Sequence, residues 1–158
     1  TVAAGYDSIK DKINLAKPEA KVTTPITSAI KVLKKKNIKN ISIFTPYTES
    51  INKSVVDYFK ESDINVKALH YFNIASDIDI GKVDKNFLFG VLSNLNLDES
   101  EALFISCTAL PALDLIEKLE KKLNKLILSS NQTLIWEALN LVNNKEIVKG
   151  YGKIFEIS

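Results

Sequence analysis

Short apolar segments alternate with longer amphipathic segments along most of the chain, and this alternation restricts the fold more than any other feature. The short segments are rich in β-branched and aromatic residues, which predicts strands. The longer segments repeat their apolar residues with a period of about 3.6, which predicts helices. Strands separated by helices pair in parallel through right-handed crossovers. The sequence therefore predicts an α/β fold, a three-layer Rossmann-like lobe with a mainly parallel sheet.

The elements are assigned from these periods and from helix caps. Thr23 or Thr24 caps the second helix, with Pro25 in its first turn, and Asp84 lies near the start of the fourth. Residues 73–82 show neither period and are predicted to be irregular. Strands are predicted at residues 41–45, 66–72, 102–105 and 126–128, with a further one at 154–157. Helices are predicted at residues 8–16, 24–36, 48–61, 83–95, 110–124 and 131–142.

The composition excludes several classes of protein. Of the 158 residues, 46% are hydrophobic and 25% are charged, which suits one domain of ordinary size. The net charge of +2 is too small to indicate nucleic acid as a partner, and no segment approaches the roughly 18 apolar residues that span a membrane. A single cysteine, with no signal-peptide pattern at the start, predicts a reducing, cytoplasmic compartment.

Neither a metal nor a nucleotide cofactor is expected. Histidine occurs once, as His70, and no zinc-ligand spacing exists, although carboxylates alone could still hold Mg²⁺. His70 lies at the end of a predicted strand and is interpreted as a surface or packing residue. Gly150-Tyr151-Gly152 lies in the tail and is not the G-x-G-x-x-G pattern of a dinucleotide site.

Cys107, the only cysteine, lies where a predicted strand gives way to a predicted helix. A thiol at such a junction faces the positive end of the helix dipole, which favours the nucleophilic thiolate. Pro111 and Asp114 suit the first turn of that helix. The alternative is a buried structural cysteine, since free cysteine is among the most buried residue types, and the local pattern alone favours this alternative.

Polar loops follow three of the predicted strands, and each loop opens a predicted helix. The loops are Thr45-Pro46-Tyr47-Thr48, Ser106-Cys107-Thr108 and Ser129-Ser130-Asn131-Gln132. In a parallel sheet, ligands bind outside the carboxyl ends of the strands, and helix N-termini attract anions. We therefore expect a small carboxylate or phosphate to bind near the thiol.

Single residues of these loops allow two interpretations. Tyr47 either donates its phenol to a substrate carboxylate or packs its ring on the surface of a turn. Asn131 and Gln132 either hydrogen-bond the substrate or lie at the start of a helix that is capped by Ser129, Ser130 or Asn131. The capping interpretation is the simpler one. Asp77 and Asp79 form either a carboxylate pair or part of a turn.

The three loops together resemble the maleate cis-trans isomerase family of the aspartate/glutamate racemase superfamily. Arylmalonate decarboxylases and ectoine-utilisation proteins are relatives within that superfamily. The resemblance covers nearly the whole chain. It rests on Thr45-Pro46-Tyr47-Thr48, Ser106-Cys107-Thr108-Ala109-Leu110, Ser129-Ser130-Asn131-Gln132-Thr133-Leu134-Ile135-Trp136, Val22-Thr23-Thr24-Pro25 and Gly150-Tyr151-Gly152-Lys153.

The resemblance implies two Rossmann-like lobes related by a pseudo-twofold axis, each with one cysteine at a site between them. It divides this chain into a remnant of the first lobe (1–22), a second lobe (23–144) and a tail that returns to the first lobe (145–158). Thr1-Val2-Ala3-Ala4-Gly5 resembles the residues that follow the first-lobe cysteine. A chain that lacks methionine and opens on Thr1 is expected to be processed, truncated or incompletely recorded. The implied partner is a first-lobe segment or a second copy of the chain.

The resemblance also implies roles for individual residues. Cys107 matches the second-lobe catalytic cysteine, and Tyr47 matches a tyrosine that binds a substrate carboxylate. The other substrate-binding candidates are Thr48, Asp77, Thr108, Asn131 and Gln132. Asp77 falls near an asparagine of the isomerases, and a carboxylate there repels a dicarboxylate unless it is protonated or paired with a cation.

The implied activity is a cofactor-independent isomerisation or racemisation of a small dicarboxylate or amino acid by cysteine chemistry. Decarboxylation of a malonate, which needs one cysteine, is the first alternative. A non-catalytic protein that binds a small carboxylate is the second. We expect the two ends of the chain to pack against each other and to leave Ile9, Ile13, Ile154 and Phe155 exposed.

Overall fold

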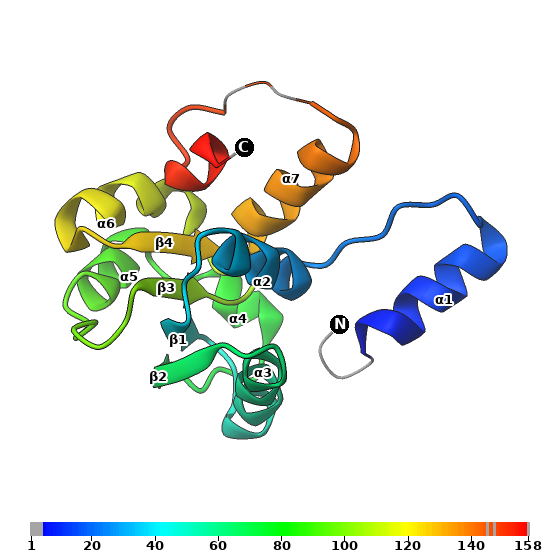
Figure 1. The fold of residues 1–158 in the computed structure, drawn as a ribbon. Helices are drawn as coiled ribbons and strands as arrows, with labels where there is room; N and C mark the ends of the chain where they lie inside the picture. Colours follow the sequence, from blue (N-terminus) through cyan, green and yellow to red (C-terminus); the bar gives the residue numbers. More distant parts are fainter. Residues whose placement is uncertain (1–4, 145, 147, 158) are drawn as a thin grey trace.

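Four parallel strands form the centre of the fold, in the order β2-β1-β3-β4 (Figure 1). The computed structural model describes residues 5–144, 146 and 148–157. Both central strands are almost wholly buried, as expected for parallel strands between two helical layers. The predicted α/β fold is confirmed. The strands are β1 (Asn40–Thr45), β2 (Asn65–Tyr71), β3 (Ala102–Ile105) and β4 (Leu126–Ser129).

Helices cover both faces of the sheet. One layer contains α2 (Pro25–Lys35), α3 (Glu49–Glu61) and α7 (Ser130–Leu141), and the other contains α4 (Asp77–Gly81), α5 (Lys85–Leu92), η1 (Leu113–Leu115) and α6 (Ile116–Leu123). The first layer packs on strand residues such as Ile43 and Phe104, and the second on Leu103 and Ile105. Two separate apolar clusters result, because successive side chains of a strand point to opposite faces.

The predicted caps of two helices are confirmed. Thr24 caps α2 in a reciprocal pair with Thr27, in which each hydroxyl accepts the other residue's backbone N–H, at 3.4 and 3.2 Å. Asp84 caps α5 by accepting the backbone N–H of Phe87 at 2.8 Å. Capping acts within one turn of helix, so the sequence alone identifies these starts.

Two segments of the second layer differ from their prediction. Residues 73–82 are not irregular throughout, because Ser76 caps α4 by accepting the backbone N–H of Asp79 at 3.4 Å. The helix predicted at 110–124 does not begin until η1, and Cys107 is therefore separated from it by a loop. Pro111 disfavours the helical conformation at Leu110, the residue before it, so the helix does not begin at Leu110.

The tail packs into the core of the lobe. The strand predicted at 154–157 is instead a 3-10 helix, η2 (Lys153–Glu156), which contacts α7 and β4. Ile154 is fully buried, and Trp136 donates its Nε1–H to the carbonyl oxygen of Ile157 at 2.9 Å. The expected exposure of Ile154 is therefore wrong, because α7 and β4 supply the apolar surface that covers it.

The first helix, α1 (Tyr6–Ala16), extends away from the sheet and does not lie against η2 (Figure 1). It buries none of its residues, and the exposed fractions of Ile13 and Leu15 are 39% and 85%. The expectation that the two ends pack together is therefore wrong. The expected exposure of Ile13 is confirmed, whereas Ile9 is half-buried and Phe155 is half-buried against the first-layer cluster. Among the described residues, no helix is both long and apolar enough to cross a membrane.

Candidate active site at the carboxyl edge of the sheet

Three strand ends lie side by side at the edge where the sequence predicts the site. The register pairs Phe44 of β1 with Ile105 of β3, and Ile105 with Ser129 of β4. The loops that leave these strands therefore begin at one level. Two of them, after β1 and β4, open directly into α3 and α7, whereas the loop after β3 carries Cys107 without starting a helix. The structure thus places two of the three predicted helix N-termini at this edge.

Cys107 has a strained backbone that is held by α7. Its φ is +124°, in a region of backbone conformation that residues other than glycine rarely adopt. Such a conformation typically costs about 1–3 kcal/mol. The backbone N–H of Cys107 donates to Oγ of Ser130, the first residue of α7, at 3.0 Å. The side chain is 7% exposed and lies in the apolar cluster of the second layer. The N-terminus beside the cysteine therefore belongs to α7 and not to the helix that follows it in sequence.

Tyr47 lies beside this cysteine. Its ring is half-buried and packs against both apolar clusters. Burial raises the pKa of Tyr47 well above its usual value. Cys107 raises this pKa further, through its charge when it is ionised and through a hydrogen bond with the phenol. A hydrogen bond with the Ser106 side chain lowers this pKa, and the carboxylate of Asp77 adds a smaller upward effect. At neutral pH the phenol is therefore a protonated hydrogen-bond donor next to the thiol.

Asn131 and Thr108 connect the β3 and β4 loops. Asn131 donates its Nδ2–H to the carbonyl oxygen of Thr108 at 3.2 Å, and the Thr108 side chain is exposed. Thr48, at the start of α3, is half-buried and shares a 3.4 Å hydroxyl contact with Ser50. These side chains border the loops that surround Cys107.

The other two substrate-binding candidates have different surroundings. Gln132 is fully buried, and both ends of its amide are occupied: Oε1 accepts the backbone N–H of Ser129 at 2.9 Å, and Nε2 donates to the carbonyl oxygen of Tyr151. The predicted cap is confirmed in Ser129, whose Oγ accepts the backbone N–H of Gln132 at 3.3 Å. Asp77 is exposed at the start of α4, while Asp79 pairs with Lys82 at 3.0 Å.

Sequence reasoning missed a set of buried polar contacts behind Tyr47. Oγ1 of Thr45 accepts the backbone N–H of Tyr47 at 3.2 Å and donates to Oδ1 of Asn52, whose Nδ2 donates to the carbonyl oxygen of Tyr47 at 3.1 Å. One signal could have revealed it. Asn52 lies at helical spacing from Val55 and Phe59, so it is a polar residue on the apolar face of α3.

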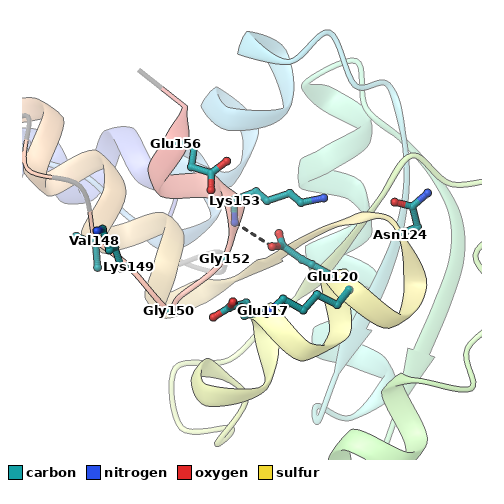
Figure 2. Close-up of a pocket in the computed structure, with 10 residues that line it drawn as sticks. Glu117, Glu120, Asn124, Val148, Lys149, Gly150, Gly152, Lys153 and Glu156 are labelled. Atoms are coloured by element: carbon teal, nitrogen blue, oxygen red, sulfur yellow. Dashed lines mark hydrogen bonds and ion pairs between the residues drawn. The ribbon is translucent and has the colours of Figure 1, made fainter.

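A separate hollow of about 310 Å³ lies between α6 and the tail and contains none of the predicted site residues. Figure 2 shows Glu120 of α6 directed toward Lys153, whose backbone N–H it accepts at 2.9 Å. The second oxygen of Glu120 accepts the backbone N–H of Ile127 at 3.3 Å. Burial raises the pKa of Glu120 against the lowering effect of these two bonds. The carboxylate thus joins α6, β4 and the tail.

Comparisons with known proteins agree on the relatives of this chain. A family model described as arylmalonate decarboxylase matches residues 5–155. The chain is 26% identical over 117 residues to the maleate isomerase of Geobacillus stearothermophilus, covering 73% of this chain and 47% of that protein. It is 25% identical over 127 residues to the maleate isomerase of Alcaligenes faecalis, with coverages of 80% and 49%. The chain therefore spans about half the length of these curated relatives.

Solved structures show the same fold. A maleate cis-trans isomerase variant from Nocardia farcinica, with a covalently bound succinylcysteine intermediate, superposes with a TM-score of 0.86 at 18% identity, covering 94% of this chain and 61% of that one. Unliganded arylmalonate decarboxylase superposes with a TM-score of 0.82 at 21% identity, with coverages of 100% and 72%.

Proposed function

Because this chain belongs to the arylmalonate decarboxylase family, we propose that it carries the Cys107 side of an active site that isomerises or racemises a small dicarboxylate or amino acid without a cofactor. The observation that carries this proposal is the placement of Cys107 at the carboxyl edge of the sheet, where Ser130 of α7 holds its backbone and Tyr47 packs against the same apolar cluster. The names of the relatives support it, since they include maleate isomerases that match most of this chain.

In the isomerisation, a thiolate adds to one alkene carbon of a cis-dicarboxylate. The electron pair of the double bond moves onto the neighbouring carboxylate, so the former double bond becomes single and rotates. Its return expels the thiolate and leaves the trans product. Cys107 acts either as this nucleophile or as the acid and base that serves a thiol on the opposite face. In the racemisation, the two thiols exchange the α-proton from opposite faces.

The residues around Cys107 suit the charge that develops. Tyr47, protonated at neutral pH, donates its phenol to a substrate carboxylate, where negative charge accumulates in the intermediate. Thr48, Thr108 and Asn131 border the same edge and complete the polar surroundings of the substrate. The positive N-terminal end of the α7 dipole further stabilises the negative charge of the intermediate.

The opposing thiol comes from outside the described residues. We propose that a first-lobe segment or a second copy of the chain supplies it, with residues 1–22 as a first-lobe remnant and residues 23–144 as the second lobe. The tail (145–158) is proposed to lead back to the first lobe, although its helix η2 packs on α7 and β4 of the second. The chain's coverage of about half of its relatives supports this division.

Two other functions are each supported by a specific observation. Decarboxylation of a malonate is favoured by the family match and needs only one cysteine, which protonates the enediolate left by loss of carbon dioxide. Non-catalytic binding of a small carboxylate is favoured by the exposed carboxylate of Asp77, which acts on Tyr47 and repels a second carboxylate of the substrate.

Parallel assays distinguish these functions. Maleate isomerisation, aspartate racemisation and arylmalonate decarboxylation are measured on the chain together with the first-lobe segment or second copy that supplies the opposing thiol, and on Cys107→Ser in the same assembly. The exposed-tyrosine variant Tyr71→Phe is a control that retains Cys107. Cys107→Ser is expected to abolish the active reaction, because a hydroxyl is a far weaker nucleophile and acid than a thiol at neutral pH. Equal turnover in Cys107→Ser and the parent would remove the thiol from the mechanism. Binding of a carboxylate without turnover of any substrate would favour the non-catalytic function.

A further inference from the structure

We propose that Asn52 and Thr45 are positioning residues that fix Tyr47 against Cys107. Both residues are buried, at 1% and 0% exposure, and they lie in regular elements: Asn52 in α3 and Thr45 at the end of β1. The inference rests on the proposed function, because it concerns the residue that serves the thiol.

Two hydrogen bonds hold the backbone of Tyr47, one on each side of its Cα. Its N–H donates to Thr45 Oγ1 at 3.2 Å, and its carbonyl oxygen accepts from Asn52 Nδ2 at 3.1 Å. The Thr45 hydroxyl then donates to Asn52 Oδ1, so the amide and the hydroxyl satisfy each other. Both peptide groups that flank the Tyr47 Cα are therefore tied to buried side chains, and the direction in which its ring leaves the backbone is set.

Helix capping does not explain Asn52. The side chain belongs to the first turns of α3, yet its hydrogen bonds go to Thr45 and Tyr47, which precede the helix, and not to free backbone N–H groups of the first turn. Thr48, the residue at the N-cap position, makes no side-chain cap bond. Burying an amide and a hydroxyl without full pairing destabilises a protein, and an aliphatic pair would fill this space without that cost.

The loop around Tyr47 is also fixed from the neighbouring segment. The carbonyl oxygen of Thr45 accepts the backbone N–H of Phe72 at 3.1 Å, and that of Pro46 accepts the N–H of Ile74 at 2.8 Å. The Thr45–Asn52 pair extends this restraint to Tyr47, whose phenol lies beside Cys107 and Ser106. A displacement of about 1 Å in such a group can cost on the order of 100-fold in rate.

Alkylation of Cys107 tests the proposal without requiring turnover. Iodoacetamide labelling is unambiguous because the chain has a single cysteine. Its rate is measured against pH in the parent, Tyr47→Phe, Asn52→Ala and the double variant. Tyr47→Phe is expected to move the midpoint of the profile to higher pH by at least 0.3–0.5 units, roughly a two- to threefold change, since the phenol no longer donates to the thiolate. Asn52→Ala is expected to move it the same way, and to add nothing in the Tyr47→Phe background.

Two further variants separate positioning from general loosening of α3. Val55→Ala removes a side chain that is 2% exposed on the same helix and makes no bond to Tyr47, so it is expected to lower stability but leave the profile unchanged. Thr45→Val keeps the shape, removes the hydroxyl and provides the same test if Asn52→Ala does not fold. The proposal would be overturned if Val55→Ala moved the midpoint of the labelling profile as far as Asn52→Ala does. It would also be overturned if Tyr47→Phe moved the midpoint while Asn52→Ala and Thr45→Val kept the profile of the parent. A failure of the proposed function instead appears as Cys107→Ser with full turnover.

Discussion

At the scale of single residues, Cys107 combines an unfavourable backbone conformation with a buried contact that maintains it. The φ of +124° is costly for any residue with a side chain, and Ser130 Oγ accepts the N–H of this residue at 3.0 Å. Strain of this kind persists where the surroundings determine the conformation, and it is common at sites of catalysis. Ser130 thus fixes the cysteine from β4's side of the edge, as Thr45 and Asn52 fix Tyr47 from β1's side.

Removing this contact should reduce stability. Ser130→Ala leaves the buried N–H of Cys107 without a partner, so the free energy of unfolding is expected to fall by about 1–3 kcal/mol. Urea denaturation measures the change. Ser54→Ala, at an exposed position of α3, is the control and should stay within about 0.5 kcal/mol of the parent. A loss in Ser130→Ala no larger than in the control would show that Ser130 does not hold the cysteine.

At the scale of elements, the sequence correctly predicts those strands and helix caps that depend on residues close together in the chain. The strand at 102–105 and the caps of Thr24 and Asp84 follow from side-chain period and from bonds within one turn. The edge that carries Tyr47 and Cys107 follows from parallel pairing alone. Long-range contacts explain the failures. Residues 154–157 have strand-like composition but pack as η2 on α7 and β4, and Asn52 acts through residues that the sequence places outside its helix.

The contact of Glu120 with the tail predicts a dependence of stability on pH. Because burial raises the pKa of Glu120 in the folded protein above its unfolded value, its contribution is greatest below the unfolded value and is lost as pH rises through the folded value. The free energy of unfolding of the parent relative to Glu120→Gln should therefore fall as pH rises above about 4.3, the ordinary pKa of a glutamate carboxyl. Denaturation at a series of pH values measures the difference. A difference between the parent and Glu120→Gln that stays constant or rises with pH would mean that burial does not dominate at Glu120.

At the scale of the whole molecule, α7 connects the proposed site with the tail. Three residues at its start have different roles. Ser129 caps the helix, Ser130 accepts the backbone N–H of Cys107, and Gln132 donates to the carbonyl oxygen of Tyr151. The strand order β2-β1-β3-β4 places β1 and β3, the sources of Tyr47 and Cys107, next to each other at the centre of the sheet. The sequence does not encode this order in any local pattern, because it arises from the packing of whole crossover units. The fold thus brings the thiol and the phenol to one edge.

The most direct measurement of substrate binding at this edge is protection of Cys107 from iodoacetamide. Maleate, aspartate and phenylmalonate are each added over a concentration series, with a neutral diamide of maleate as the control compound. At least one of the carboxylates is expected to slow labelling of Cys107 by tenfold or more at saturation, since it would cover the thiol while Tyr47 binds its carboxylate, and Tyr47→Phe should weaken that protection. Labelling at the same rate with and without all three carboxylates would contradict a carboxylate site at Cys107.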